Sequence, residues 1–467
     1  MRSLLVLLAL ALCTTAQARH PSKKPAAHPA PEAAAPAFDF PYPLQVDRLP
    51  NGLTVVRVHY PSPGTVAFES LVRVGSRNEV EAGRTGYAHF FEHMMFRGTK
   101  KVSSEARSRF LASVGADDNA FTTDDFTLFY TLLPTTGLDE LLSIESDRFE
   151  HLAYSEPDFQ TEAKAVLGEY HKDAAGPELK VEETLAANAF TVHPYRHTTL
   201  GFLRDVENMP KGYAYSQTFF NRWYTPDNVT LFIVGDFDDA KVMAAVKERY
   251  GAWQGKAANV RIPAEPRQGG QISVSIPWPS ETLPRLINAW HSPAATLTTD
   301  VTAVQEVLAQ YIAGPTSPLY KSLVLDKQWA TSLDGSADPH RDPYLFIVDA
   351  TLKDPQNLHS AQEQFNSTIK HMVGKPPDAA RVESIKSHLK YTLLMNLNAP
   401  NRVATQLAVA AGAFGAPDAL PKLYARIGQV KPSELQDLAK HLFLASNRTI
   451  VTLHPKSAAG NASKGGH

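Results

Sequence analysis

The order of apolar and polar residues predicts a chain of mixed helices and strands. Runs rich in β-branched and aromatic residues indicate strands, whereas apolar residues spaced three and four apart indicate amphipathic helices. In the first half of the chain, strands are expected at 51–60, 64–76, 119–134 and 228–237. Helices are expected within 86–99 and at 104–114, 137–150, 156–173 and 239–250.

The pattern begins again after a polar stretch with Gly and Pro at 255–271, the best candidate for a domain boundary. Each half closes with a helix, an Asn-bearing turn and a strand (226–236 and 446–455), which is weak evidence for duplication. In the second half, strands are expected at 272–276, 344–352 and 446–455, and helices at 300–313 and 318–326. We therefore predict an α+β fold of two similar layered domains, 45–255 and 272–455, joined by a linker at 256–271.

Length and charge narrow the class of protein. At 467 residues the chain is too long for one ordinary domain, and its 43% hydrophobic and 20% charged residues are globular values. The formal net charge of -2 argues against a nucleic-acid partner, because there is no basic excess to neutralise phosphates.

The ends of the chain predict export and flexible segments. Residues 1–18 have a positive start, an apolar run too short to span a bilayer and an Ala-Gln-Ala cleavage site, so we expect a signal peptide and no stable membrane anchor. Residues 19–44 form a Pro/Ala-rich linker, and 456–467 a disordered tail. Cleavage removes Cys13, the only cysteine, so a metal would have to bind His and carboxylate. The expected location is periplasmic or secreted.

Two histidines stand four apart in "GYAHFFEHMMFRGT" (86–99), with a glutamate directly before the second. On a helix, His89, Glu92 and His93 project from one face. Neutral imidazoles are good zinc ligands, and the glutamate is close enough to take a proton from a water at an open position. This is the HExxH arrangement of thermolysin-like enzymes in reverse order. An ordinary helix is the alternative, because the chain has 17 histidines.

A catalytic zinc site also needs a third protein ligand. In "EPDFQTEAKAVLGEYHKD" (156–173), Glu162 and Glu169 are seven apart and therefore lie two turns along one helical face. Most such glutamates are simply solvated. Here Val166 and Leu167 lie close by, so this helix has to dock near the same face.

At this point the sequence resembles the pitrilysin/insulinase family of zinc metallopeptidases, the inverzincins, and within it the short-chain branch that includes mitochondrial processing peptidase. The histidine motif matches almost letter for letter, and "VLGE" ends at Glu169 with 75 residues between it and His93, as in the family. The resemblance is dense over about 48–250 and thinner over 270–455. Further matches are Asn51-Gly52-Leu53, "VGSRNE" (74–79), "NAFT" (119–122), "HPYRHTTLG" (193–201) and "FFNRWYTPDNVTLFIVGD" (219–236).

The resemblance implies a role for each matching residue. His89, His93 and Glu169 would bind one zinc ion per chain, with a water at the fourth position. Glu92 would be the general base for attack on a peptide carbonyl, and Glu162 would be an accessory catalytic residue.

The resemblance also implies how a peptide binds. The family strand that corresponds to "NAFT" pairs with the substrate backbone, so Asn119, Ala120 and Phe121 are expected substrate contacts. Main-chain pairing of this kind implies broad specificity. His193 and His197 form a second pair four apart, but Pro194 and Gly201 place them in a loop or at a helix start. The family motif implies a structural or substrate-flanking role for "HPY" rather than a second metal.

The second half departs from the family pattern. The family carries an arginine in a G-x-x-SRL turn and a tyrosine about a dozen residues later, which contact substrate and the oxyanion. Here Pro318 stands at the arginine position and Thr331 near the tyrosine position. Ser317 can cap the following helix, and proline suits its first turn, so the change makes local sense but removes a cation.

Family members close a chamber with four such domains, and this chain supplies two, which implies a partner. We favour a heterodimer whose other subunit carries the missing Arg/Tyr pair, over a homodimer that uses Tyr320, Lys321 or another donor. The function expected is an exported zinc endopeptidase acting on unfolded peptides. The rival hypotheses are a non-catalytic binding or assembly subunit and a purely structural zinc site.

Overall fold

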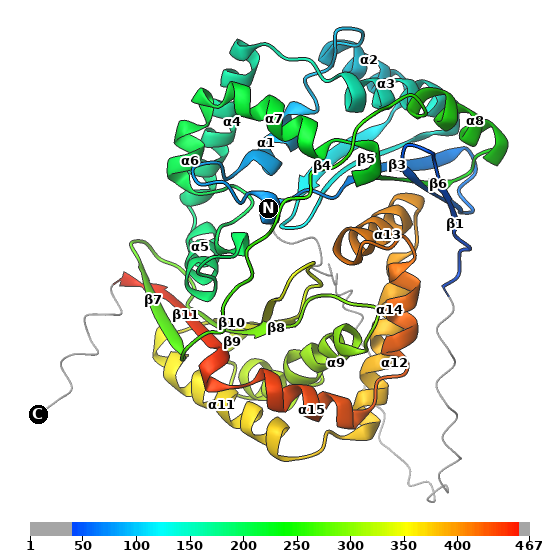
Figure 1. Ribbon diagram of the computed structural model, residues 1–467. Coiled ribbons are helices and arrows are strands. Elements are labelled where there is room, and N and C mark those ends of the chain that lie inside the picture. The colour runs from blue at the N-terminus through cyan, green and yellow to red at the C-terminus, as the bar shows by residue number, and fades with distance from the viewer. Residues whose placement is uncertain (1–39, 457–467) are drawn as a thin grey trace, which may run out of the picture.

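The computed structural model describes residues 40–456 and consists of two halves, each built on one β-sheet (Figure 1). The predicted signal peptide at 1–18, the linker up to residue 39 and the tail from residue 457 lie outside the described residues. The predicted fold class, α+β with two similar layered domains, is confirmed. The boundaries given for those domains stay a prediction.

The first sheet has six strands in the order β1-β2-β6-β3-β5-β4. β2 and β6 are parallel, and the remaining neighbours in this sheet are antiparallel. This order leaves β4 at one edge of the sheet, where only one of its sides is paired. The strands are β1 (Gln45–Arg48), β2 (Thr54–His59), β3 (Thr65–Val72), β4 (Asp117–Thr122), β5 (Thr127–Pro134) and β6 (Val229–Gly235).

The second sheet repeats this topology without a counterpart of β1. Its order is β7-β11-β8-β10-β9, again with one parallel pair, β7 and β11, in which the last strand of the half pairs with the first. The same connection of five strands in both halves supports the duplication. The strands are β7 (Ile272–Trp278), β8 (Arg285–Ser292), β9 (Ala330–Ser336), β10 (Tyr344–Leu352) and β11 (Arg448–Pro455).

Helices cover one face of each sheet with residues from the same half. The first half has α1 (Tyr87–Met94), α2 (Ser104–Val114), α3 (Leu138–His151), α4 (Glu156–Ala174), α5 (Pro177–Ala189), α6 (Leu203–Asn208), α7 (Tyr213–Trp223) and α8 (Asp239–Tyr250). The second has α9 (Val301–Ala313), α10 (Pro318–Tyr320) with a π-helical continuation Lys321–Asp326, α11 (Leu358–Gly374), α12 (Ala379–Asn396), α13 (Pro400–Phe414), α14 (Ala419–Ile427) and α15 (Pro432–Leu442).

The other face of each sheet is covered by a helix from the opposite half. Val403 and Leu407 of α13 join the core formed by Val56 and Phe232 of the first sheet. In return, α5 packs on β7 and β11 of the second sheet, and Val181 belongs to the core there. Figure 1 shows α13 (orange) below the first sheet and α5 (green) beside the second. The halves therefore do not form independent cores.

The strand predicted at 119–134 is in fact a hairpin. β4 and β5 are separated by a turn in which the Thr123 hydroxyl accepts hydrogen bonds from the amides of Asp125 (3.2 Å) and Phe126 (3.1 Å). Such local bonds compete with the strand ladder. The single strand was wrong because the Thr and aromatic content of the whole segment predicts strand, whereas the two aspartates within it mark a turn.

The last residues of the expected linker pack against the first half. Phe40, Tyr42 and Leu44 pack against the core shared by the first sheet and α13, and the Tyr42 hydroxyl donates to the carbonyl of Leu397 (3.3 Å). Three apolar side chains at alternate positions are enough to attach this segment.

Among residues 40–456, no helix combines the length and apolar character needed to cross a membrane.

Glu69 on β3 lies fully buried between the first sheet and α13. Thr405 of α13 donates to its Oε1 at 2.6 Å, and Oε2 has no hydrogen-bond partner within the described residues. Burial raises the pKa of Glu69 to about 8, although the Thr405 hydroxyl lowers it. The side chain is therefore protonated at neutral pH.

We expect Glu69→Gln to remove a pH dependence of stability. Between the ordinary pKa of 4.5 and the folded pKa of about 8, only the folded state holds this proton, so rising pH destabilises the unmodified protein. Its free energy of unfolding should fall, relative to the variant, by up to about 1.4 kcal/mol per pH unit in this window. Urea unfolding at pH 5, 7 and 9 measures the difference, and parallel curves would contradict the prediction.

Candidate metal centre

Helix α1 begins at a buried carboxylate that fixes its direction. Glu79 of "VGSRNE" accepts hydrogen bonds from the amides of Gly86 and Ala88, both at 2.7 Å. These amides belong to the first turn of a helix, where intrahelical acceptors are lacking. Gly86 has φ +89°, and a Cβ there would lie 2.7 Å from the carbonyl oxygen of Leu200, so only glycine fits.

Helix α4 presents two glutamates to α1. Its start is fixed by a capping box in which Ser155 and Asp158 exchange hydrogen bonds. Phe159 then packs on Phe90 with ring centroids 4.9 Å apart. This contact turns the face that carries Glu162 and Glu169 toward the histidines.

The structure brings His89, His93 and Glu169 together, with one potential ligand atom from each within 4.8 Å of the others. Glu169 Oε2 lies 3.6 Å from His89 Nε2 and 3.3 Å from His93 Nε2. Two ligands held about 2.0–2.1 Å from a tetrahedral ion lie roughly 3.3–3.4 Å apart. The donor set and its spacing therefore fit zinc, with a fourth position left for a non-protein ligand.

The two imidazoles differ in charge. His89 is buried, and burial followed by repulsion from His93 lowers its pKa to about 4, so it is neutral as a metal ligand must be. Burial alone would lower the pKa of His93, but its bonds to Glu162 and Glu169 raise it to about 9. The hydrogen bond from His93 lowers the pKa of Glu169 to about 2. His93 and Glu169 thus attract each other across 3.3 Å.

Glu162 lies on the far side of His93 from this cluster. Its Oε1 accepts a hydrogen bond from His93 Nδ1 at 2.9 Å, and its Oε2 accepts from Arg97 Nε at 2.6 Å. Burial raises the pKa of Glu162, but the bonds to His93 and Arg97 outweigh it, so the carboxylate is ionised and acceptor-only. It therefore fixes the proton on Nδ1 and leaves Nε2 for the metal. This position favours a positioning role over the catalytic role expected from the sequence.

We expect Glu162→Ala to lower zinc affinity about 10- to 100-fold, because the partner that orients His93 is lost. Competition against a zinc-binding dye measures the change. Glu156→Ala, on the exposed first turn of the same helix, is the matched control. Equal affinity of Glu162→Ala and the control would contradict this role.

Glu92 projects beside the cluster and is held by a residue that sequence reasoning did not single out. The hydroxyl of Thr122, the last residue of β4, donates to Glu92 Oε2 at 2.7 Å. Burial raises the pKa of Glu92, although the Thr122 bond lowers it. A carboxylate with a raised pKa is suited to accepting a proton. The sequence shows Thr122 as the threonine of "NAFT", but it does not indicate that this threonine bonds Glu92.

The three expected substrate contacts lie on the edge strand β4, but their side chains differ in exposure to solvent. Asn119 is exposed, and its Oδ1 accepts from the amide of Ala120 at 2.8 Å. The side chains of Ala120 and Phe121 are buried in the cores on opposite faces of the sheet. A peptide added at this edge would therefore meet main chain and Asn119 rather than the other two side chains.

The departures in the second half have a clear local structure. Ser317 caps α10 by accepting from the amide of Tyr320 at 2.9 Å, and Pro318 occupies the first turn, as expected. Thr331, the second residue of β9, is exposed, and its hydroxyl donates to the carbonyl of Thr351 (3.3 Å). Neither residue supplies a cation or a phenol.

The two histidines of the second pair, His193 and His197, bond to different partners. His193 Nε2 donates to Asp342 Oδ2 at 2.9 Å, and its Nδ1 accepts from the amide of Tyr195. His197 is buried and bonds the carbonyl of Thr198 at 3.0 Å. Within the described residues the three-residue cluster with Glu169 is the only group spaced for a metal ion, and neither of these histidines belongs to it.

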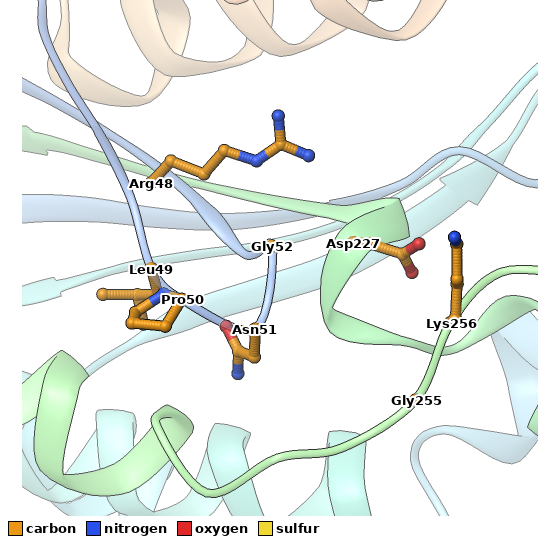
Figure 2. Close-up of a pocket in the computed structure, with 8 residues that line it drawn as sticks. All are labelled: Arg48, Leu49, Pro50, Asn51, Gly52, Asp227, Gly255 and Lys256. Carbon is orange, nitrogen blue, oxygen red and sulfur yellow. The ribbon is translucent and has the colours of Figure 1, made fainter.

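A separate surface pocket lies at the β1–β2 turn (Figure 2). Asn51 attaches this turn to the end of α8 by donating to the carbonyls of Tyr250 (2.8 Å) and Trp253 (3.0 Å), and Gly52 has φ +99°. The "NGL" motif is thus structural. The pocket holds none of the candidate ligands, and its lining residues are Arg48, Leu49, Pro50, Asn51, Gly52, Asp227, Gly255 and Lys256.

Comparison with known proteins gives consistent matches in both halves. Residues 54–201 match the family profile "Insulinase (Peptidase family M16)", and residues 214–389 match "Peptidase M16 inactive domain". The zinc protease PqqE of Helicobacter pylori is 24% identical over 363 residues, or 76% of this chain and 80% of that protein. A protein named zinc protease Rv2782c, from Mycobacterium tuberculosis, is 30% identical over 228 residues, 49% of this chain and 51% of its own length.

Solved structures give the same fold. A protease from Helicobacter pylori has a TM-score of 0.81 at 24% identity, covering 89% of this chain and all of that one. The periplasmic protease PqqL of Escherichia coli has a TM-score of 0.75 at 19% identity, and the match covers 92% of this chain but 49% of PqqL. The chain thus corresponds in fold to about half of PqqL. The chain described here belongs to the insulinase-type M16 family of peptidases.

Proposed function

We propose that this chain is an exported zinc-dependent endopeptidase that hydrolyses peptide bonds of unfolded peptides or small proteins. The observation that carries the proposal is the arrangement of His89, His93 and Glu169 at tetrahedral spacing with the buried carboxylate of Glu92 beside them. Relatives named as zinc proteases support the same reading.

Each residue has a separate task in this proposal. His89 Nε2, His93 Nε2 and Glu169 would hold one zinc ion per chain, with Glu162 orienting His93. Zinc, when bound, supplies the positive charge that polarises a peptide carbonyl and acidifies water. Glu92 accepts the proton of the attacking water and returns it to the leaving amine, and Thr122 holds its carboxylate in place.

The substrate would bind as an added strand at β4. An edge strand offers unpaired amides and carbonyls to an extended peptide, and it reads main chain rather than sequence. An unfolded peptide can take up this extended conformation over its whole length, which favours unfolded substrates. Of the three expected contacts, Asn119 is the one whose side chain is exposed to meet the peptide.

The proposal includes a second peptidase-like subunit. Pro318 and Thr331 leave this chain without the arginine and tyrosine of the family, and the chain corresponds to about half of PqqL. We therefore propose a heterodimer whose partner brings that pair, with a homodimer as the alternative. The short apolar start of the sequence supports export to the periplasm or the medium.

Zinc removal tests the proposed reaction. The mature chain is expected to cleave a fluorescence-quenched unstructured peptide, to lose this activity on chelation and to regain it when about one equivalent of zinc is returned. Undiminished cleavage after zinc is removed would contradict the proposal. Adding the candidate partner subunit to the same assay measures whether the missing Arg/Tyr pair limits the rate.

A further inference from the structure

A loop of the second half contacts the turn that follows the expected substrate strand. His340, between β9 and β10, bonds Asp124 Oδ2 through Nε2 at 3.1 Å. The next amide, of Arg341, donates to Asp125 Oδ2 at 2.9 Å. Asp124 and Asp125 form the β4–β5 turn together with Thr123 and Phe126. Residues more than 200 positions apart are thus joined at one hairpin.

The same loop is anchored to two motif segments of the first half. Asp342 Oδ2 accepts from Arg77 Nε (2.6 Å) and from His193 Nε2 (2.9 Å). The Tyr195 hydroxyl donates to Asp125 Oδ1 at 2.7 Å. The "GSRNE" and "HPY" motifs therefore converge on this contact, which accounts for residues that the metal cluster does not use.

His340 is bound as a cation. Its Nδ1 faces the carbonyl of Asp338 at 2.7 Å and its Nε2 faces the carboxylate of Asp124, so both nitrogens donate. The ring stacks on Tyr344 with centroids 3.5 Å apart. Burial lowers its pKa, but the neighbouring carboxylates raise it to about 9. The charge-assisted hydrogen bond between His340 and Asp124 is partly buried, and such a bond is stronger than one between neutral groups.

The turn is connected to the candidate general base, Glu92, through a single residue. Thr122, whose hydroxyl holds Glu92, is the residue before the turn. Across the hairpin, Thr127 pairs with Thr122 and donates through its hydroxyl to the carbonyl of Val74 at 2.9 Å. A shift of the turn would therefore move Thr122 and release Glu92.

The second half also holds the turn from its other side. A Cβ at Gly412 of α13 would lie 2.3 Å from the Cδ1 atom of Phe126, so the helix touches the ring at this point. Alanine is a better helix former than glycine. The glycine is therefore explained by the close approach of Phe126 rather than by the helix.

We infer that His340 is a positioning residue: through its bond to Asp124, the second half of the chain fixes the β4–β5 turn, and with it Thr122 and Glu92. The structural part of this inference stands on the contacts alone, while its effect on turnover rests on the proposed function. The second half is then a working part of the site of the first, although it lacks ligands of its own in the metal cluster.

Hydrogen exchange on the zinc-loaded full chain tests the inference with His340→Gln. Amides of residues 117–126 should exchange at least about 10-fold faster than in the unmodified protein, while α1 and α4 keep their protection and zinc stays at one per chain. Peptide turnover should fall about 10-fold in kcat. His359→Gln, a histidine of the same half with 85% of its side chain exposed, is the matched control and should change neither.

Gly412→Ala gives a second, independent variant. It should loosen the same ten residues by displacing Phe126, without touching His340. Unchanged exchange at 117–126 in His340→Gln would overturn the inference whatever Gly412→Ala does. Acceleration spread evenly over the chain would overturn it too, because that indicates global destabilisation. Faster exchange confined to the turn in a protein that shows no peptidase activity would support the positioning contact and count against the proposed function.

Discussion

The Glu92→Gln variant is expected to bind zinc as the unmodified chain does and to cleave peptide about 100- to 10,000-fold more slowly, the range that a general base contributes. Glutamine keeps the shape of the side chain and an oxygen for the Thr122 hydroxyl, which lies 2.7 Å from Oε2. It cannot accept a proton from water. The loss should therefore fall on kcat, with zinc content and folding preserved.

Cleavage of a quenched peptide and zinc content by mass spectrometry measure the two effects on the same sample. Glu207→Gln, an exposed glutamate on α6, is the control and should keep full activity. This experiment also separates the proposed enzyme from its main rival. A binding or assembly subunit would perform its role equally well with Glu92→Gln, and activity within a factor of two would exclude Glu92 as the base.

The Glu169→Gln variant is expected to lose zinc affinity by more than the 10- to 100-fold that loss of an orienting partner costs, because a direct ligand is removed. Its carboxylate is 3.6 Å from His89 Nε2 and 3.3 Å from His93 Nε2, and it carries the negative charge of the cluster. An amide oxygen is a neutral and much weaker ligand. Two histidines would remain, too few for a catalytic zinc site.

Thermal unfolding with and without zinc gives a second measurement of the same change. A ligand at 100 times its Kd stabilises the folded state by about 2.7 kcal/mol, so zinc should raise the Tm of the unmodified chain. The shift should vanish in Glu169→Gln and persist in Glu156→Gln, which is exposed on the same helix. An equal shift in both variants would show that Glu169 is not a ligand.

Much of the fold was predictable because its elements are locally determined. The helix expected at 104–114 is α2 at Ser104–Val114, and the helix expected at 239–250 is α8 at Asp239–Tyr250. Both begin at a side-chain cap, Ser103 and Asp238, which the local sequence supplies. The strands β1, β8 and β9 and the helices α5 and α6 were not predicted, since their apolar patterns depend on packing partners.

The candidate ligands were also predictable, because helical spacing places His89 and His93 on one face and Glu162 and Glu169 on another. Their separate tasks were not. Spacing cannot tell which glutamate meets Nε2 and which meets Nδ1, and this depends on the contact of Phe90 with Phe159. The sequence therefore placed Glu162 among catalytic residues, whereas the fold puts it behind His93.

The amino-acid order by itself determined the order of helices and strands in two halves, the histidine motif and the loss of the family arginine at Pro318, because each depends on residues close together in the chain. Only the tertiary structure decided which helix covers which sheet, that Thr122 holds Glu92, and that His340 of the second half meets Asp124 of the first. The hydrogen bond between Thr405 and Glu69 joins residues 336 positions apart, and the free energy of such contacts arises only after the halves have packed. The periodicity of apolar residues shows which face of a helix or strand is buried. Only the packed structure shows which element covers that face.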